Sequence, residues 1–289
     1  MNNVINAVSH VVITPVKNEK NIIQGCIDSM MSQSILPKLW IIIDDNSTDG
    51  TDTIIENAII KYSNIRIIKS EIMANNRKRG KNIANMFLQA FELIDFDWDF
   101  CSKIDSDILL EKNYFELLFS KFKQEPLLGI ASGNCNIING TKFKLEKVSP
   151  DHTRGALKTY KSECYYQIGG VRPVDGWDGI DNIMAQMHGW QTKNFQDILT
   201  IHLRNTGSYN GILSGSFENG KFAYFMGYHP LFMAARSAHK FISPPYLVGG
   251  VALFMGYMTS FISKKPIYQD KEVVNFLRKK QLKKMRLKR

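Results

Sequence analysis

The order of apolar strands and amphipathic helices constrains the fold of this chain more than any other feature. Leu39 to Ile43 is apolar without interruption, which is typical of a parallel strand that is covered on both faces. Further strands are predicted at 10–16, 65–68 and 98–104, and apolar residues recur at helical spacing between them. Such an alternation predicts an α/β fold, in which helices flank both faces of a mostly parallel sheet.

The strand over 98–104 leads into Asp105-Ser106-Asp107. Side chains alternate along a strand, so two carboxylates one residue apart point the same way and repel each other unless a cation separates them. Oxygen ligands at this spacing suit Mg²⁺ or Mn²⁺, and such an ion with open positions suits a diphosphate. We therefore predict a metal–diphosphate site, with a solvated loop as the alternative.

Other polar clusters follow the first two strands. Lys17-Asn18-Glu19 ends the first, and Asp44 to Thr51 ends the second. Ligands of parallel sheets bind at the carboxyl ends of the strands, so this coincidence favours a site at that edge. Asp44 is expected to bond loop amides, and Asn18 or Asn21 is expected to cap the next helix.

A basic loop, Asn75 to Asn82, precedes the helix that continues through Phe91. Cations at a helix N-terminus form a plausible anion site, and solvated charges are the alternative. Later in the chain we expect a helix at 113–123, a strand at 129–138 and a hairpin turn at Asn139-Gly140. A helix after Asn182 and a strand at 198–203 complete this part.

Composition excludes several classes of protein. A chain of 289 residues with 44% hydrophobic content can bury a large core. Its four cysteines are scattered, which argues against a disulfide framework and suits a reducing compartment, and no secretory signal is visible. The net charge is +10, but residues 278–289 hold eight cations and no acid, leaving +2 elsewhere. The body has no basic face with interleaved aromatics, so we expect no nucleic-acid partner.

At this point the chain resembles the family 2 glycosyltransferases, which have the GT-A fold and use nucleotide-sugar donors. The resemblance covers about residues 10–205. The chain looks like bacterial members of the family that build surface polysaccharide. It rests on Ile13 to Glu19, Ile43 to Thr51 and Asp105 to Asp107, in that order, and on the helix before Gly189-Trp190. The Gln-x-x-Arg-Trp motif of processive members is absent, which argues against a polymer synthase.

The resemblance implies roles for particular residues. Thr14, Val16 and Glu19 would line the nucleotide pocket, Asp45 would contact the base, and Lys81 would lie near the base or the phosphates. Asp105 would lie near the ribose, and the Mn²⁺ or Mg²⁺ ligands would be Asp107 and His202. An ordinary strand histidine is the alternative for His202.

The catalytic base is assigned by counting back from Gly189-Trp190. Asp178 matches the family position best, although Trp177 replaces the usual acid before it, so Asp181 stays a rival. The chemistry of the reaction also favours a base that is separate from the metal site. Transfer with inversion needs one carboxylate to deprotonate the acceptor hydroxyl, and a metal to neutralise the departing diphosphate.

The composition shifts after residue 206. Residues 206–289 are predicted to form a C-terminal helical extension of the catalytic domain at 1–205. Tyr246 to Ile262 is apolar and is flanked by cations, which suits a segment that spans, enters or lies on the cytoplasmic face of a membrane. The basic tail would attract anionic lipid. The alternative is a buried helical hairpin with a solvated tail, in a protein that is cytoplasmic.

We therefore predict a metal-dependent, inverting glycosyltransferase that acts on a lipid-linked oligosaccharide at the membrane. Two rivals remain open. A sugar-phosphate nucleotidyltransferase shares the sheet architecture but would need a glycine-rich loop with arginine after the first strand, which Thr14 to Asn18 does not supply. A non-catalytic accessory protein with a degenerate donor site would bind no donor. The sequence leaves the sugar, the nucleotide base and the linkage open.

Overall fold

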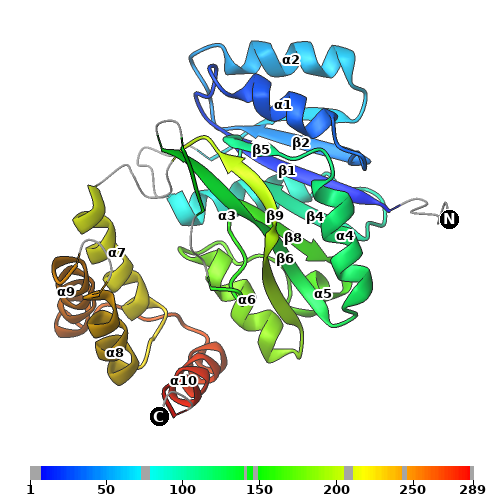
Figure 1. Cartoon of the computed structure of the whole chain (residues 1–289). Coiled ribbons are helices and arrows are strands. Elements are labelled where there is room, and N and C mark those ends of the chain that lie inside the picture. The colour runs from blue at the N-terminus through cyan, green and yellow to red at the C-terminus, as the bar shows by residue number, and fades with distance from the viewer. Residues whose placement is uncertain are drawn as a thin grey trace. The chain divides into compact units, whose positions relative to one another are not determined.

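The computed structural model describes residues 8–72, 79–139, 142–145, 149–204, 211–242 and 246–286. The chain divides into two compact units, Met1–Arg204 and Asn205–Arg289 (Figure 1). The functional meaning of this division, a catalytic domain followed by a helical extension, stays a proposal.

One sheet organises the first unit, with its described strands in the order β3-β2-β1-β4-β8-β6-β9-β5, and β7 beside β6. The pairs among β1, β2, β3 and β4 are parallel, as is β6 with β9, whereas β8 pairs antiparallel with both β4 and β6. The strands are β1 (His10–Val16), β2 (Leu39–Asp44), β3 (Ile65–Lys69), β4 (Phe100–Ile104), β5 (Ile108–Leu110), β6 (Leu128–Asn139), β7 (Lys142–Leu145), β8 (Leu157–Lys161) and β9 (Gln191–His202).

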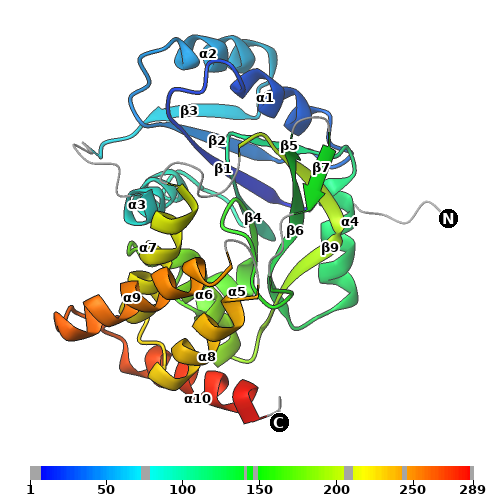
Figure 2. The same ribbon diagram turned by 60° about the vertical axis from the view of Figure 1, so that its left-hand side comes forward.

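Helices cover both faces of this sheet, as Figure 2 shows for α1 and α2 on one side and α3 on the other. The helices are α1 (Ile23–Met31), α2 (Thr51–Lys61), α3 (Arg79–Phe91), α4 (Tyr114–Gln124), α5 (Ser162–Gln167) and α6 (Trp177–Met187). Apolar residues of α1, α2 and α4 pack with β1 and β2 side chains in one buried cluster. On the opposite face, Phe87 of α3 packs against the rings of Tyr160 and Tyr165.

The α/β class and the GT-A arrangement are confirmed, and the structure refines the sheet. Its first half is parallel as predicted, but β4-β8-β6 is antiparallel, because β8 returns directly after the long hairpin region and not through a crossover helix. The hairpin prediction is supported by the pairing of Asn139 with Lys142, while Gly140 lies outside the described residues. The predicted asparagine cap is wrong: α1 begins after Ile22 without a side-chain cap.

The second unit consists of helices in its described part. They are α7 (Gly211–Phe225), α8 (Pro230–Lys240), α9 (Val248–Ile262) and α10 (Lys271–Arg286). Met233 of α8 and Leu253 of α9 share a small buried cluster with Ala223 and Tyr257. Among the described residues, no helix combines the length and the apolar character that a membrane crossing needs.

Candidate active site

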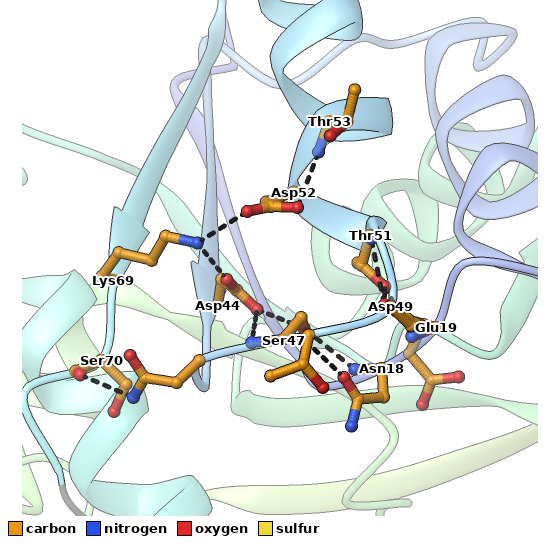
Figure 3. Close-up of polar contacts among 12 residues, drawn as sticks. Asn18, Glu19, Asp44, Ser47, Asp49, Thr51, Asp52, Thr53, Lys69 and Ser70 are labelled. Carbon is orange, nitrogen blue, oxygen red and sulfur yellow. Dashed lines mark hydrogen bonds and ion pairs between the residues drawn. The ribbon is translucent and has the colours of Figure 1, made fainter.

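Two loops at the carboxyl ends of β1 and β2 are joined by side-chain hydrogen bonds (Figure 3). The backbone amide of Asn18 donates to Ser47 Oγ over 2.9 Å, and Asn18 Oδ1 accepts from the amide of Thr48 over 2.8 Å. The amide of Glu19 donates to Thr51 Oγ1 over 2.8 Å. Asn18 adopts a left-handed backbone, with φ 53°, which asparagine tolerates better than most residues. The loops therefore form one platform at the sheet edge.

The two neighbouring aspartates of this platform, Asp44 and Asp45, differ in burial. Asp44 is fully buried and accepts from the amide of Ser47 and from Lys69, as Figure 3 shows, which agrees with its predicted structural role. Its neighbour Asp45 is partly exposed and pairs with Lys17 over 2.8 Å. Asp45 is thus held at the surface of the platform, and its contact with a nucleotide base stays a prediction.

The side chains of Thr14 and Val16 point into the protein. Thr14 is fully buried, and its hydroxyl accepts a hydrogen bond from the indole of Trp40 over 2.9 Å. Val16 belongs to the apolar cluster beneath α1 and α2. Any contact of these two residues with a nucleotide falls to their backbone, and their predicted role is untested.

The Asp105-Ser106-Asp107 turn separates its two carboxylates. Asp105 forms an ion pair with Lys103, whose side chain is buried. Asp107 Oδ2 lies 3.4 Å from His202 Nε2 and accepts a hydrogen bond of 3.0 Å from Arg204 Nε. The same guanidinium also pairs with Glu19. Arg204 therefore bridges the carboxylates that end β1 and β4.

The balance between burial and these contacts shifts the pKa values of Asp107 and Glu19 in opposite directions. Burial raises the pKa of Asp107, but hydrogen bonds and charge from His202 and Arg204 outweigh it and leave the pKa below its usual value. In Glu19 burial prevails over the Arg204 contact, so its pKa is raised. The lowered pKa favours the charged form of Asp107, and its role as a metal ligand stays a prediction.

Asp107 and His202 fit a divalent ion that takes its other ligands from a substrate. They converge because β5 and β9 are antiparallel, which sets Ile108 opposite His202. Among the residues that the structure describes, no group of three or more histidine, cysteine, aspartate or glutamate side chains could hold a metal by itself. Mg²⁺ and Mn²⁺ sites commonly use one or two protein ligands with substrate phosphates and water. The donor set suits the predicted ion, and this assignment stays a proposal.

Asp181, the rival candidate for the base, is enclosed in the protein. Only 1% of the residue is exposed. Lys158 pairs with its carboxylate over 2.6 Å, and the Tyr160 hydroxyl donates to it. Burial raises the pKa of Asp181, against the opposing effect of Lys158 and Tyr160. With these two partners, and with Lys158 also donating to the carbonyl oxygen of Asp178, Asp181 is suited to holding the first turn of α6, and its rival role as the base stays a prediction.

Asp178 lies in the first turn of α6 and is partly exposed. Within the described part of the chain its carboxylate accepts no hydrogen bond. It lies against Gly155, where an added Cβ would come within 2.8 Å of Asp178 Oδ2. The next residue, Ala156, accepts a hydrogen bond of 3.0 Å from the amide of Asp105. Gly155 and Ala156 thus link Asp178 to the Asp105 turn.

At the start of α3, where an anion site was predicted, one backbone amide is already occupied by a side chain of the protein. Asp175 Oδ1 accepts a hydrogen bond of 3.1 Å from the amide of Lys81. A Cβ on Gly80 would lie only 2.9 Å from the same oxygen, so glycine permits this close approach. Asn75 to Lys78 lie outside the described residues. The side chain of Lys81 is exposed, and its role near the phosphates stays a prediction.

Sequence reasoning missed four side chains at this edge. Lys103 and Arg204 were passed over because lysine and arginine usually lie on the surface. The position of Lys103 inside an apolar strand was the available signal for a buried cation. The four are Lys103, Lys158, Asp175 and Arg204.

Comparison with known proteins decides the family. The sequence model described as "Glycosyl transferase family 2" matches residues 11–176, which is more than half of the chain. The chain belongs to this family. The predicted family and the enzyme class, glycosyltransferase, are confirmed. The match includes both platform loops and the Asp105 turn, whereas Asp178, Asp181 and His202 lie beyond it.

Relatives of this family member include polysaccharide synthases. The Poly-beta-1,6-N-acetyl-D-glucosamine synthase of Staphylococcus aureus is 30% identical over 161 residues, which are 55% of this chain and 36% of that protein. The Staphylococcus epidermidis synthase is 26% identical over 161 residues, with the same coverage. The chain thus spans about a third of the length of the curated relatives that it matches.

Solved structures share the fold at low sequence identity. Staphylococcus aureus TarS gives a TM-score of 0.53 at 14% identity, over 88% of this chain and 44% of that one. The mannosyltransferase PcManGT of Pyrobaculum calidifontis, in complex with GDP-Man and Mn²⁺, gives 0.55 at 15% identity, over 96% and 75%. These structural similarities support the GT-A fold of this chain.

Proposed function

We propose that this protein transfers a sugar from a nucleotide-sugar donor to an acceptor hydroxyl in the synthesis of a cell-surface polysaccharide. The observation that carries the proposal is that two carboxylates near the same sheet edge have different surroundings. Asp107 is charged and lies beside His202, whereas Asp178 is partly exposed and without a partner in the described residues. A cation site and a separate base are what transfer with inversion requires.

Each residue has a distinct task in this proposal. Asp107 and His202 hold Mn²⁺ or Mg²⁺, which supplies charge neutralisation for the donor diphosphate. Asp178 accepts the proton of the acceptor hydroxyl as its oxygen bonds to the anomeric carbon of the donor sugar. The bond from that carbon to the diphosphate oxygen breaks with its electrons, so the anomeric configuration inverts.

The donor side uses the joined loops of β1 and β2. Asp45 and Asp105 are partly exposed near the strand ends and are suited to contacts with the base and the ribose. Solved neighbours bind GDP-Man and UDP, which is consistent with a nucleotide-sugar donor here. For the acceptor we propose a lipid-linked saccharide, since curated relatives are named as synthases of poly-beta-1,6-N-acetyl-D-glucosamine and residues 246–262 are apolar.

Donor hydrolysis tests the proposal and separates it from its rivals. The full chain with Mn²⁺ is incubated with UDP-, GDP- and dTDP-sugars, and release of the nucleoside diphosphate is measured. We expect one nucleotide class to be hydrolysed slowly and to bind in calorimetry. Release of pyrophosphate from a nucleoside triphosphate and a sugar phosphate would favour a nucleotidyltransferase. No donor binding at millimolar concentration would favour an accessory protein.

A further inference from the structure

Helix α9 packs mainly small residues against its own unit and exposes large apolar side chains, which is the reverse of a typical helix in a water-soluble protein. Its packed face consists largely of small residues, namely Gly249, Gly250, Gly256 and Ser260. Its exposed face carries large apolar side chains, namely Val248, Val251, Phe254, Met255, Phe261 and Ile262. An amphipathic helix in water normally turns such side chains toward the core, so the exposed face of α9 is suited to an apolar environment.

The close packing of α9 within its unit explains this inversion. A Cβ on Gly256 would lie 1.9 Å from the carbonyl oxygen of Phe217 in α7, and one on Gly220 would lie 2.0 Å from that of Leu253. A Cβ on Gly250 would lie 2.4 Å from the carbonyl oxygen of Ser237 in α8. Glycine lets helix backbones touch, as in helix pairs that pack in lipid. That face also holds two large buried side chains, Leu253 and Tyr257, while glycine occupies the points where the helix backbones touch.

Charge in the chain that follows α9 is mostly positive, although Asp270 and Glu272 are exposed acids there. No charged residue occurs between Ser243 and Ser263, and Lys264 and Lys265 follow directly. α10 buries Val273, Val274 and Leu277 and exposes cations on its other side. The exposed cations are Lys271, Lys279, Lys283, Lys284 and Arg286. Cations near an anionic lipid surface attract the protein to it, and the attraction weakens with salt.

We propose that the exposed face of α9 and the exposed cations of α10 form a docking surface for an anionic lipid bilayer. α9 has 15 residues, so at about 1.5 Å per residue it is shorter than a bilayer core of about 30 Å. It therefore lies in the plane of the interface, with Val251 and Met255 inserted among the acyl chains. A second copy of the chain fits less well, because pairing two such faces would bring two cationic rims together.

The role of this docking surface rests on the proposed function, because membrane binding would bring the enzyme to a lipid-linked acceptor. The contacts themselves do not require sugar transfer. Vesicle binding and donor hydrolysis are therefore measured separately on the same full-length protein, with hydrolysis assayed without vesicles. Loss of donor hydrolysis would contradict the enzymatic proposal alone, whereas loss of vesicle binding would contradict the docking surface alone.

Sedimentation with vesicles provides the test. The full chain is mixed with phosphatidylcholine vesicles, or with vesicles in which phosphatidylglycerol replaces part of that lipid. We expect binding to be about tenfold tighter to the anionic vesicles and to weaken with salt. The double variant Val251→Glu, Met255→Glu should bind at least about tenfold more weakly. The matched control is Ile60→Glu on α2, where the side chain is 85% exposed, and it should bind like the wild type.

A second set of variants separates charge from insertion. Changing Lys279, Lys283 and Lys284 to glutamine should remove most of the preference for anionic vesicles. Brominated lipid should quench the tryptophan fluorescence of a Met255→Trp variant more than that of the wild type, because residue 255 is inserted among the acyl chains. The native tryptophans all lie before residue 205. Failure of the wild type to bind vesicles would overturn the proposal. So would a wild-type dimer that Val251→Glu, Met255→Glu converts to a monomer with unchanged vesicle binding, since the face would then join two copies.

Discussion

Lys103 of β4 and Lys158 of β8 are direct partners across two antiparallel strands, and both side chains are buried. Their ammonium groups lie 5.9 Å and 5.4 Å from the centre of the Trp177 ring. Lys103 pairs with Asp105, whereas Lys158 pairs with Asp181 and donates to the carbonyl oxygen of Asp178. Adjacent buried cations are stable only when each has its own carboxylate. The two pairs therefore connect the Asp105 turn to the first turn of α6.

Lys158→Met should destabilise the protein strongly. The substitution leaves the Asp181 carboxylate buried with only Tyr160 as a side-chain partner, and breaking a buried ion pair costs about 3–5 kcal/mol. Urea unfolding measures the change. The double variant Lys158→Met, Asp181→Leu removes both charges and should regain most of the lost free energy of unfolding. Simple additivity of the two single changes would contradict this coupling.

Asp178→Asn should reduce turnover and leave the fold intact. Removal of a general base lowers kcat by roughly 100-fold to 10,000-fold. Because the Asp178 carboxylate has no partner among the described residues, the melting temperature should change little. The matched variant is Asp181→Asn, three residues on, which should lower the melting temperature as its main effect. Wild-type turnover in Asp178→Asn would show that the base assignment is wrong.

Arg204→Gln should tighten binding of Mn²⁺ in the absence of donor. Arg204 donates to Asp107 Oδ2 over 3.0 Å and thereby competes with a cation for that oxygen. Release of the carboxylate should raise Mn²⁺ affinity by about tenfold. Electron paramagnetic resonance of free Mn²⁺ measures it. Arg172→Gln is the control, because Arg172 bonds backbone carbonyls and, within the described part of the chain, no carboxylate. Unchanged affinity in Arg204→Gln would refute the competition.

His10 should make stability depend on pH. Burial lowers the pKa of His10 from 6.5 to about 3, and its Nε2 lies 2.8 Å from Ser102 Oγ. The unfolded chain therefore takes up the proton first, so this contribution is present above pH 6.5 and is lost as pH falls toward 3. The loss is about 3 kcal/mol at pH 4. Denaturant unfolding between pH 4 and 7 should give a shallower slope for His10→Gln, and equal slopes would contradict the assignment.

Local patterns were sufficient to predict much of the first unit. The uninterrupted run from Leu39 to Ile43 identified a strand covered on both faces, and Asp105-Ser106-Asp107 was expected at a strand end. Hydrophobic periodicity is local, and the edge at which parallel strands end follows from their common direction. The antiparallel entry of β8 was not predictable, because pairing partners distant in the sequence leave no local signal.

The sequence by itself determined the α/β class, the family, the strand ends that carry the acids and the apolar character of residues 246–262. Only the tertiary structure distinguished Asp178 from Asp181, since three residues along a helix separate a partly exposed carboxylate from one enclosed by Lys158 and Tyr160. It also placed Asp175 on the amide of Lys81 and Arg204 on Asp107. Burial and ion pairing depend on residues far apart in the chain, so they are decided when the chain folds.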